Sequence, residues 1–422
     1  MRGVYIHIPF CKNICSYCDF CKFLYNEEWA NTYLDFLNQE IKEYYEGDKV
    51  KSVYIGGGTP SSLSISNLNK LFEIVSHIRT IEDVEITFEC NINDISLELL
   101  EILKNNNVNR LSIGVESFNK KNLKLMNRNH NKKDIFEKIN LCKKSGFKNI
   151  NVDLIYALPE ESLFTLKNDL NSILKLGITH ISTYSLIIEE HTVLHNNKTM
   201  PIDELLDYKM YKHICRKLKK KGFHHYEVSN FSLPGYESKH NLIYWDNNEY
   251  YGFGLGAHGY INEMRYENTR NFNKYLNGQY RLNELLVSTQ EEMENEVILG
   301  LRKLDGISIS EFHERFKKDI FKVFKIDDAV NKKYLVASSP YLSINSSGYT
   351  TFPFDFDIFP SFIIIKLCTN ICFGSGKSND IKNIGQYIKW NLAISFPIIC
   401  KSGDQYFLNS SSSSVINPSA VK

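Results

Sequence analysis

The segment Val4-Tyr-Ile-His-Ile-Pro-Phe-Cys-Lys-Asn-Ile-Cys-Ser-Tyr-Cys18 joins a short apolar run to three closely spaced cysteines. A β-rich apolar run of this length is typical of a buried strand, and Pro9 ends it. Five more runs of the same kind follow along the first half of the chain. They are Ser52–Gly56, Val84–Glu89, Arg110–Val115, Ile150–Tyr156 and His180–Leu186. The repetition predicts a sheet of six strands, of which Val4–Ile8 is the first.

Segments with the apolar periodicity of a helix separate these runs. They include Glu27–Tyr45, Leu68–Ile78, Leu97–Leu103, Phe136–Cys142 and Leu163–Leu176. Strands and helices that alternate in this way predict an α/β protein with a parallel sheet. Unusual polar residues gather at the C-terminal ends of the strands, which converge on one mouth in a barrel but only near the switch point in an open sheet. We therefore expect a partial (β/α)6 barrel.

The rest of the chain is expected to add smaller units. We place the barrel at residues 1–225, a barrel-associated extension at 226–289 and a smaller, mainly helical C-terminal domain at 290–350. An amphipathic helix over Glu291–Leu304 is expected near the start of that domain. Residues 351–422 form an atypical tail without Glu, Arg or His, and we assign it no function.

The charge balance excludes some classes of partner. The chain has 50 Lys and Arg against 49 Asp and Glu, and a formal net charge of +1, so no bulk attraction to nucleic acid or anionic membrane is expected. The basic run Arg216–Lys221 is explained by the end of a helix before Gly222, where cations complement the helix dipole. No uncharged apolar stretch approaches the roughly 18 residues that span a bilayer. We expect a cytoplasmic protein without a nucleic-acid partner or a transmembrane segment.

Cys11, Cys15 and Cys18 place three thiols within eight residues, so that one loop could wrap a single inorganic centre. In a reducing compartment, clustered cysteines bind metal more often than they form disulfides. A structural zinc site or a closed iron–sulfur cluster needs four protein ligands, and Cys21 could supply the fourth. Three ligands to a four-iron cluster would instead leave one iron open to a further ligand. On spacing alone, both interpretations stay open.

The spacing Cys-x3-Cys-x2-Cys after a first strand resembles the radical S-adenosylmethionine (SAM) superfamily. The resemblance implies a [4Fe-4S] cluster on Cys11, Cys15 and Cys18, with an open iron that chelates SAM. It also implies an electron donor such as a flavodoxin or ferredoxin, because the cluster in that family reduces the SAM sulfonium to give a 5′-deoxyadenosyl radical. Tyr17 fits the family, and Gly56–Thr59 matches its turn that contacts the SAM amino group.

Longer motifs resemble the oxygen-independent coproporphyrinogen III oxidase family over residues 1–350. They are His7-Ile-Pro-Phe-Cys11, Gly56-Gly-Gly-Thr-Pro-Ser61, Arg110-Leu-Ser-Ile-Gly-Val-Glu-Ser117, Asn151-Val-Asp-Leu-Ile-Tyr-Ala-Leu-Pro159 and Tyr226-Glu-Val-Ser-Asn-Phe231. The resemblance implies that SAM is bound by Tyr5, Tyr17, Gly57, Gly58, Thr59, Glu89, Glu116, Arg128 and Asp153. Glu116 departs from the glutamine usual in that family. Arg128 lies in a polar stretch and, without the resemblance, would be interpreted as a solvated residue.

Cys18-Asp-Phe20 separates two branches of this family. The porphyrinogen-decarboxylating enzymes carry a fourth cysteine where this chain has Phe20. They also have a substrate-handling extension before the barrel, for which we expect no room before Cys11. Cys-Asp-Phe instead resembles the HemW-type haem chaperones.

That branch also carries His-Asn-x-x-Tyr-Trp, which is present here as His240-Asn-Leu-Ile-Tyr244-Trp245. A histidine nitrogen is a good axial ligand of haem iron, and aromatic rings offer flat apolar surface to the macrocycle. Without a family context, a histidine beside two aromatic residues is more often part of the packing. The resemblance implies that His240, Tyr244 and Trp245 bind haem.

These features together predict a haem chaperone that binds a [4Fe-4S] cluster, SAM and haem and delivers haem to an acceptor protein. We expect no coproporphyrinogen dehydrogenase activity, although the fold is that of radical SAM enzymes. The alternative is an oxygen-independent coproporphyrinogen III dehydrogenase, which removes hydrogen from propionate side chains by the deoxyadenosyl radical. A zinc-stabilised structural protein is a third class.

The segment Gly254-Leu-Gly-Ala-His-Gly259 matches the dinucleotide-binding fingerprint Gly-x-Gly-x-x-Gly. That fingerprint needs a strand before it and a helix after it. We expect neither, because no β-rich run precedes Gly254 and Tyr260–Arg270 is polar. These glycines are expected to bring the backbone close to the barrel mouth.

Overall fold

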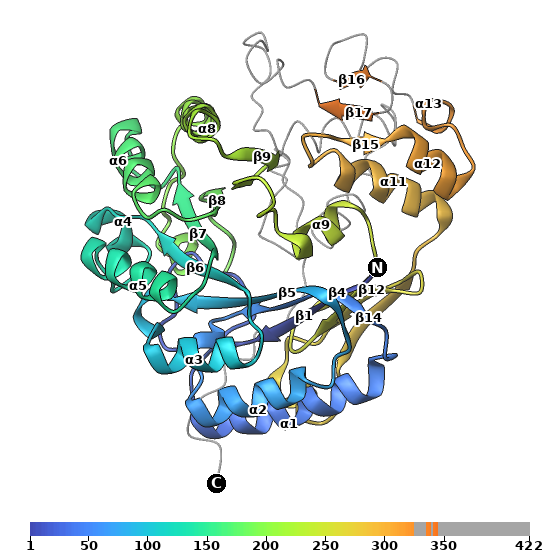
Figure 1. Ribbon diagram of the computed structural model, residues 1–422, viewed down its shortest axis with the longest axis horizontal. Helices are drawn as coiled ribbons and strands as arrows, with labels where there is room; N and C mark the ends of the chain where they lie inside the picture. Colours follow the sequence, from blue (N-terminus) through green and yellow to red (C-terminus); the bar gives the residue numbers. More distant parts are fainter. Residues whose placement is uncertain (325–334, 339–340, 345–422) are drawn as a thin grey trace.

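The computed structural model describes residues 1–324, 335–338 and 341–344. A curved sheet lies at its centre, with helices along the outer face (Figure 1). The strands and helices alternate in the order β1 (Gly3–Ile8), α1 (Glu27–Tyr44), β4 (Val50–Gly57), α2 (Ile65–Val75), β5 (Thr80–Asn91), α3 (Leu97–Asn105), β6 (Arg110–Glu116), α4 (Lys120–Leu125), α5 (Lys132–Lys144), β7 (Asn149–Tyr156), α6 (Leu163–Leu174) and β8 (His180–Ser185). All six expected runs are strands, and each pairs in parallel with the next. The prediction of a partial parallel barrel is confirmed.

Each strand divides its side chains between two faces of the sheet. In β6, Leu111, Ile113 and Val115 are buried in the hydrophobic core beneath the helices. Arg110 and Ser112 alternate with them and therefore face inward. Parallel strands covered on both faces are usually apolar throughout. The polar inner face of this sheet is therefore where a functional site is expected.

The outer helices begin at polar caps. The side chains of Asn26, Ser64 and Ser96 accept hydrogen bonds from the first turns of α1, α2 and α3. Asn131 and Asp134 form a capping box at the start of α5. These caps set the helix starts, because each satisfies backbone N–H groups that have no partner within the helix. α5 begins at Lys132, before the predicted start at Phe136. The prediction missed the first turn because that turn is polar and carries no apolar periodicity.

The sheet continues beyond both ends of the expected barrel. On one side, β11 (Tyr250–Phe253) pairs in parallel with β1, followed by the antiparallel strands β12 (His258–Ile261), β13 (Met264–Asn268) and β14 (Arg281–Leu286). On the other side, β10 (Asn230–Ser232) and β9 (His224–Glu227) add antiparallel pairs to β8. The remaining helices of this region are α7 (Val193–Asn196), α8 (Glu204–Lys220), α9 (Lys239–Trp245) and α10 (Phe272–Tyr275). α9 lies on the concave side of the sheet (Figure 1).

One expectation about the glycine segment is wrong. β11 does precede Gly254. This strand was not predicted because its four residues, three aromatic and one glycine, show no apolar alternation. The last two residues of the segment begin strand β12 instead of a helix, so the dinucleotide-binding geometry is not formed there. Gly254 and Gly256 have positive φ angles of 98° and 70°, which a side chain would disfavour.

The C-terminal part contains α11 (Thr289–Gly300), α12 (Ile309–Phe316) and α13 (Ile320–Val323). A small antiparallel sheet of β15 (Ile307–Ser308), β17 (Tyr341–Ile344) and β16 (Leu335–Ser338) accompanies these helices. The predicted helix over Glu291–Leu304 corresponds to α11. The tail assigned to 351–422 lies outside the described residues. Among the described helices, none has the length and apolar character that a membrane crossing requires.

Candidate functional site

Two short strands hold the ends of the cysteine loop. β2 (Phe10–Cys11) pairs in parallel with β3 (Phe23–Leu24), and the other two cysteines of the motif lie between them. Cys11 is buried, and the Thr59 hydroxyl donates to its Sγ at 3.4 Å. Burial raises the pKa of Cys11 to about 11 and that of Cys18 to about 12, because the thiolate loses water. These thiols fit a cationic centre, beside which they would ionise.

Contacts to α4 and α7 fix the middle of this loop. The Ser16 N–H donates to Met126 O at 3.2 Å, and Ser16 O accepts from the Leu194 N–H at 3.0 Å. The Asn127 side chain donates to Ile14 O at 2.8 Å. The loop is therefore held from two sides, which would keep the cysteines in place before any centre binds.

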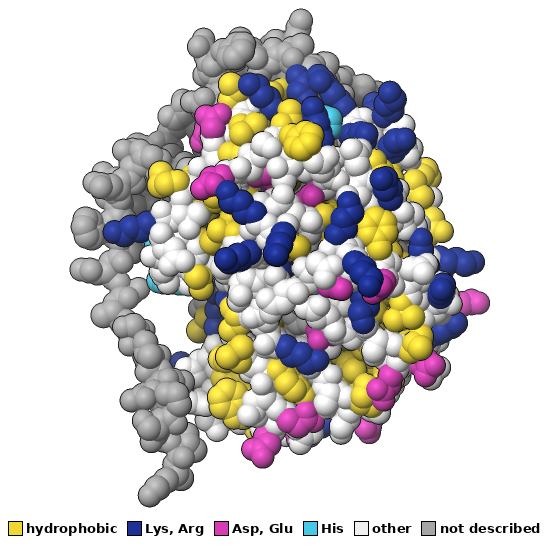
Figure 2. Space-filling model, turned by 90° about the vertical axis from the view of Figure 1, so that its left-hand side faces the viewer, with side chains coloured by type: hydrophobic (Ala, Val, Ile, Leu, Met, Phe, Trp, Pro, Cys, Tyr) yellow, Lys and Arg dark blue, Asp and Glu magenta, His cyan; other side chains and the backbone are white. Residues whose placement is uncertain are grey.

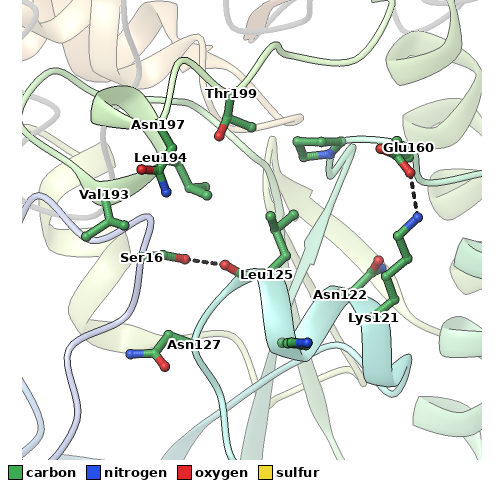
Figure 3. Close-up of a pocket in the computed structure, with 12 residues that line it drawn as sticks. Ser16, Lys121, Asn122, Leu125, Asn127, Glu160, Val193, Leu194, Asn197 and Thr199 are labelled. Atoms are coloured by element: carbon green, nitrogen blue, oxygen red, sulfur yellow. Dashed lines mark hydrogen bonds and ion pairs between the residues drawn. The ribbon is translucent and has the colours of Figure 1, made fainter.

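A cavity of about 470 Å³ adjoins the loop. Ser16, Leu125 and Leu194 line it, and the Ser16 hydroxyl donates to Leu125 O (Figure 3). Lys121 and Glu160 form an ion pair at its edge. None of the predicted site residues lines this cavity, so it borders the cysteine loop without belonging to the candidate site.

Cys21 lies apart from the three-cysteine motif. Its carbonyl accepts a hydrogen bond from His7 Nε2 at 2.8 Å, and its Sγ donates to Arg270 O at 3.8 Å. It also packs on the turn at Gly256, where an added Cβ would lie 3.0 Å from Cys21 Cβ. This position supports a three-cysteine ligand set. Within the described ranges, no three His, Cys, Asp or Glu side chains converge as for a single metal ion, and the ligand set stays a prediction.

The glycine turn after β4 is packed directly on the start of the cysteine loop. A Cβ at Gly58 would lie 2.9 Å from Ile8 O and Phe10 N, which are backbone atoms that cannot move aside. The Thr59 N–H donates to Phe10 O at 2.8 Å. Gly57 has a φ of 111° and donates its N–H to Glu89 Oε2 at 3.0 Å. The absence of side chains therefore brings the predicted SAM-binding turn beside Cys11.

Two predicted SAM-binding carboxyl groups lie on the inner face of the sheet. Burial raises the pKa of Glu89 to about 7, although the Tyr54 hydroxyl donates to it at 2.6 Å. Burial, with the charges of Glu116 and Glu89, raises the pKa of Asp153 to about 7. Buried carboxyl groups that raise one another's pKa are suited to a cationic ligand. The sulfonium and amino groups of SAM have that charge.

Arg128 is buried rather than solvated. Its guanidinium pairs with Glu116, and both side chains are at most 10% exposed. The guanidinium also donates to the Tyr17 hydroxyl at 3.4 Å. Glu116 has a φ of 64° at an irregularity between β6 and β7, which turns its side chain toward Arg128. The acidic residue that replaces the usual glutamine thus gains a buried ion pair, and Tyr17 joins it to the cysteine loop.

Tyr5 also lies on the inner face, where its hydroxyl is 2.9 Å from His7 Nδ1. Because Cys21 O can only accept, His7 Nε2 carries a proton, and Nδ1 accepts from Tyr5. Burial lowers the pKa of His7 to about 4, so the ring is neutral. A chain of two hydrogen bonds through His7 therefore connects the Tyr5 hydroxyl to the Cys21 carbonyl.

The predicted haem ligand His240 is buried near the start of α9. Its Nδ1 lies 2.8 Å from the Ser52 hydroxyl and its Nε2 lies 2.7 Å from the Tyr244 hydroxyl. Glu85 accepts from the N–H groups of Lys239 and His240, which anchors the helix N-terminus to β5. Burial lowers the pKa of His240 to about 3. The imidazole is neutral, as a ligand must be, and one hydrogen bond must open before either nitrogen binds iron.

The two aromatic residues that follow His240 in the motif contact different parts of the molecule. Tyr244 packs edge-on to His240 with ring centroids 5.0 Å apart. Trp245 instead lies under the Arg302 guanidinium, 4.3 Å from its ring centroid. The structure thus brings His240 and Tyr244 together and directs Trp245 toward the C-terminal part.

Sequence reasoning missed Tyr54 and Ser52, which connect His240 to the inner face of the sheet. Both precede Gly56 at two-residue spacing in β4, so strand alternation was the signal that could have placed them inward. It also missed the buried Arg110, which lies inside a quoted motif without an assigned role.

Comparisons with known proteins show the family and the fold of the chain. Residues 5–173 match the family model of the radical SAM superfamily, and residues 287–349 match that of the HemN C-terminal domain. The solved structure of the Escherichia coli coproporphyrinogen III oxidase HemN has a TM-score of 0.75 and 20% identity, covering 89% of this chain and 90% of that one. At that identity, the likeness shows the fold.

Curated relatives are much more similar in sequence. The protein named heme chaperone HemW from Lactococcus lactis is 39% identical over 82% of this chain and 94% of its own length. The proteins of that name from Bacillus subtilis and Escherichia coli are 39% and 30% identical over 77% and 82% of this chain, and 89% and 94% of their own lengths. The radical SAM domain implies a [4Fe-4S] cluster and SAM as cofactors. The chain belongs to the HemW family of radical SAM proteins.

Proposed function

We propose that this protein is a haem chaperone that binds a [4Fe-4S] cluster, SAM and haem and passes haem to an acceptor protein. The observation that carries the proposal is the identity of 30–39% to proteins named heme chaperone HemW over more than three quarters of the chain. The position of Cys21 away from the cysteine motif supports the same branch.

The cluster is proposed to bind through Cys11, Cys15 and Cys18. Thr59 holds Cys11 by a hydrogen bond, and the contacts of Ser16 hold the rest of the loop. When bound, the cluster would supply an open iron for SAM and an electron for its sulfonium. The protein would enclose the centre on the side of the glycine turn.

SAM is proposed to lie between the glycine turn and the inner face of the sheet. Glu89 is held by the Gly57 N–H and the Tyr54 hydroxyl, so its carboxylate is oriented before a ligand arrives. Arg128 is proposed to bind beside Glu116, with Asp153 on the neighbouring strand. Tyr5 and Tyr17 would complete the site from the side of the cysteine loop.

Haem is proposed to bind at His240 through one imidazole nitrogen, with Tyr244 and Trp245 nearby. His240 is neutral and lies close to Tyr54, which touches the proposed SAM site. The domain division at 1–225, 226–289 and 290–350 is part of the proposal, since the haem motif then falls between the radical SAM barrel and the C-terminal domain.

The acceptor protein, an electron donor such as a flavodoxin or ferredoxin, and a cytoplasmic location complete the proposal. An acidic electron carrier would fit the face made by α4, α5 and α6, where lysines outnumber acidic side chains (Figure 2). That face adjoins the cysteine loop through the contact of Ser16 with Met126.

The decisive test is anaerobic reconstitution of the cluster, followed by separate assays for haem binding and for decarboxylation of coproporphyrinogen III. We expect haem to bind and no protoporphyrinogen to form with SAM and a reductant. Transfer is measured by mixing the haem-loaded protein with an apo-haemoprotein and following its absorption. Sustained turnover of coproporphyrinogen III would establish the dehydrogenase instead, and an absence of haem binding would refute the chaperone proposal.

A further inference from the structure

Arg110 is a buried cation that has no side-chain partner among the described residues. The residue is 2% exposed, and its Nε has no hydrogen bond. Across the described part of the chain, no hydrogen bond or ion pair joins its guanidinium to another side chain. The buried arginines Arg128, Arg265 and Arg302 differ in this respect, because each has a carboxylate or amide partner. An unpaired buried charge is unfavourable, so a fold retains one where something else compensates.

The side chains around Arg110 leave its charge available. Its neighbour across β5 and β6 is Thr87, whose hydroxyl is buried and also has no partner. The flanking carboxylates of β5 are engaged elsewhere, Glu85 by the N-terminus of α9 and Glu89 by Tyr54 and Gly57. Two donors without acceptors therefore stand side by side on the inner face, which is an arrangement that suits an anion.

Arg110 lies within the electrostatic range of the proposed haem ligand. After burial, its charge is the largest contribution that lowers the pKa of His240. It has the same effect on His180, whose imidazole is held by Asn151 and Tyr226. The region around Arg110 thus contains neutral imidazoles and hydroxyl groups, together with the carboxyl groups of Glu85 and Glu89, which have donors of their own. A ligand held by His240 could reach the guanidinium with an anionic side group.

We propose that Arg110, with the Thr87 hydroxyl beside it, binds a carboxylate of the porphyrin ligand on the inner face of the sheet. The planar guanidinium donates two parallel hydrogen bonds to a carboxylate, which is the acidic group of the haem propionates. The inference rests on the proposed haem function and adds to it the group that orients the macrocycle. Haem bound by His240 would then be fixed at its iron and at one edge.

The test compares haem with haem dimethyl ester, in which both propionates are blocked. Wild type, Arg110→Met and Arg110→Lys, each with its cluster reconstituted, are titrated with both ligands. We expect wild type to bind haem roughly ten- to a hundred-fold more tightly than the ester, and Arg110→Met to bind both alike. Arg110→Lys should retain part of the preference for haem, because it keeps the positive charge but loses the planar guanidinium that donates two parallel hydrogen bonds.

Thermal unfolding of the ligand-free proteins separates binding from a structural role. Arg110→Met should unfold at the same temperature as wild type or higher, since it removes a buried charge that has no ion-paired side chain among the described residues. Arg265→Met is the matched control, a buried arginine with a partner in Asn247, and should unfold earlier while keeping the preference for haem.

Three results would overturn the inference. Equal binding of haem and ester by wild type would refute it alone and leave the haem function standing. Earlier unfolding of Arg110→Met, with both ligands weakened equally, would assign Arg110 to the structure. Failure of wild type to bind either ligand would refute the proposed function together with the inference.

Discussion

The rings of Tyr54 and His240 lie 5.1 Å apart between centroids on the inner face of the sheet. The hydroxyl of the same tyrosine donates to Glu89 at 2.6 Å. One side chain therefore contacts both the candidate haem ligand and a candidate SAM residue. Because the ring and the hydroxyl serve different neighbours, a substitution can separate their contributions.

Tyr54→Phe should weaken SAM binding and leave haem binding unchanged. The change removes a hydrogen bond to a carboxylate, which is typically worth about 1.5–3 kcal/mol, or at least roughly ten-fold in affinity. The ring that packs on His240 remains. SAM affinity is measured on the cluster-loaded protein by equilibrium dialysis, and haem binding by absorption titration.

Tyr45→Phe is the control for this change, because the hydroxyl of this residue at the end of α1 contacts only the backbone of Asp48 and Arg79 within the described residues. It should affect neither ligand. A Tyr54→Phe protein that binds SAM as tightly as wild type would remove Glu89 from the proposed site.

Substitution of the cysteines should divide them into two groups. Cys11→Ala, Cys15→Ala and Cys18→Ala should each lose the four-iron cluster, since an open-iron cluster has no spare protein ligand. Cys21→Ser should retain it, because Cys21 Sγ is directed to Arg270 O. Iron and sulfide per chain are measured after anaerobic reconstitution. Cluster loss in Cys21→Ser, with an unchanged circular dichroism spectrum, would return the fourth cysteine to the ligand set.

The sequence was sufficient to predict the strand order of the barrel, because each strand is buried on the outer side and its apolar run is visible locally. The position of β11 was not predictable in this way. Val4 pairs with Tyr251, which lies in the extension beyond residue 225, and nothing local indicates which strand β11 joins. Tertiary packing decides which strand pairs with the second side of β1, and it leaves little trace in the periodicity of the sequence.

The candidate site shows the same limit at the level of side chains. The three cysteines and Gly56–Thr59 were predicted because each motif consists of residues that are close together in the sequence. The burial of Arg128 depends on Glu116 and on Tyr17, which comes from a loop more than a hundred residues away. The Ser52–His240 contact spans 188 positions. Such pairs form only when the strands meet, and a polar residue in a polar stretch gives no sign of them.

Tyr244→Phe should strengthen haem binding if iron takes Nε2 of His240. The Tyr244 hydroxyl occupies that nitrogen at 2.7 Å, so its removal abolishes a competitor. A neutral hydrogen bond contributes about 0.5–1.5 kcal/mol, which corresponds to a gain of roughly two- to ten-fold. Affinity and the Soret band are followed by titration with haem.

Tyr250→Phe is the matched control, because its ring packs 4.7 Å from Tyr244 and its hydroxyl interacts with Arg265. It should leave haem affinity unchanged. In His240→Ala the Soret band should shift and affinity should fall, whereas the same substitution of His258 should have a smaller effect. Weaker binding in Tyr244→Phe, with a normal spectrum in His240→Ala, would identify another iron ligand.

Glu161→Gln should flatten the pH dependence of stability. Burial raises the pKa of Glu161 from 4.5 to about 8, although Leu158 N–H and Asn122 donate to it. Between these two pKa values the folded state holds a proton that the unfolded state releases. The contribution of Glu161 to the free energy of unfolding is therefore fully present below about pH 4.5 and is lost as the pH rises through about 8. Glutamine keeps the acceptor and cannot ionise. In urea unfolding of ligand-free protein, the variant should equal wild type at pH 4 and exceed it by on the order of 5 kcal/mol at pH 8.5. Parallel pH profiles for the two proteins would show that Glu161 is ionised in the folded state.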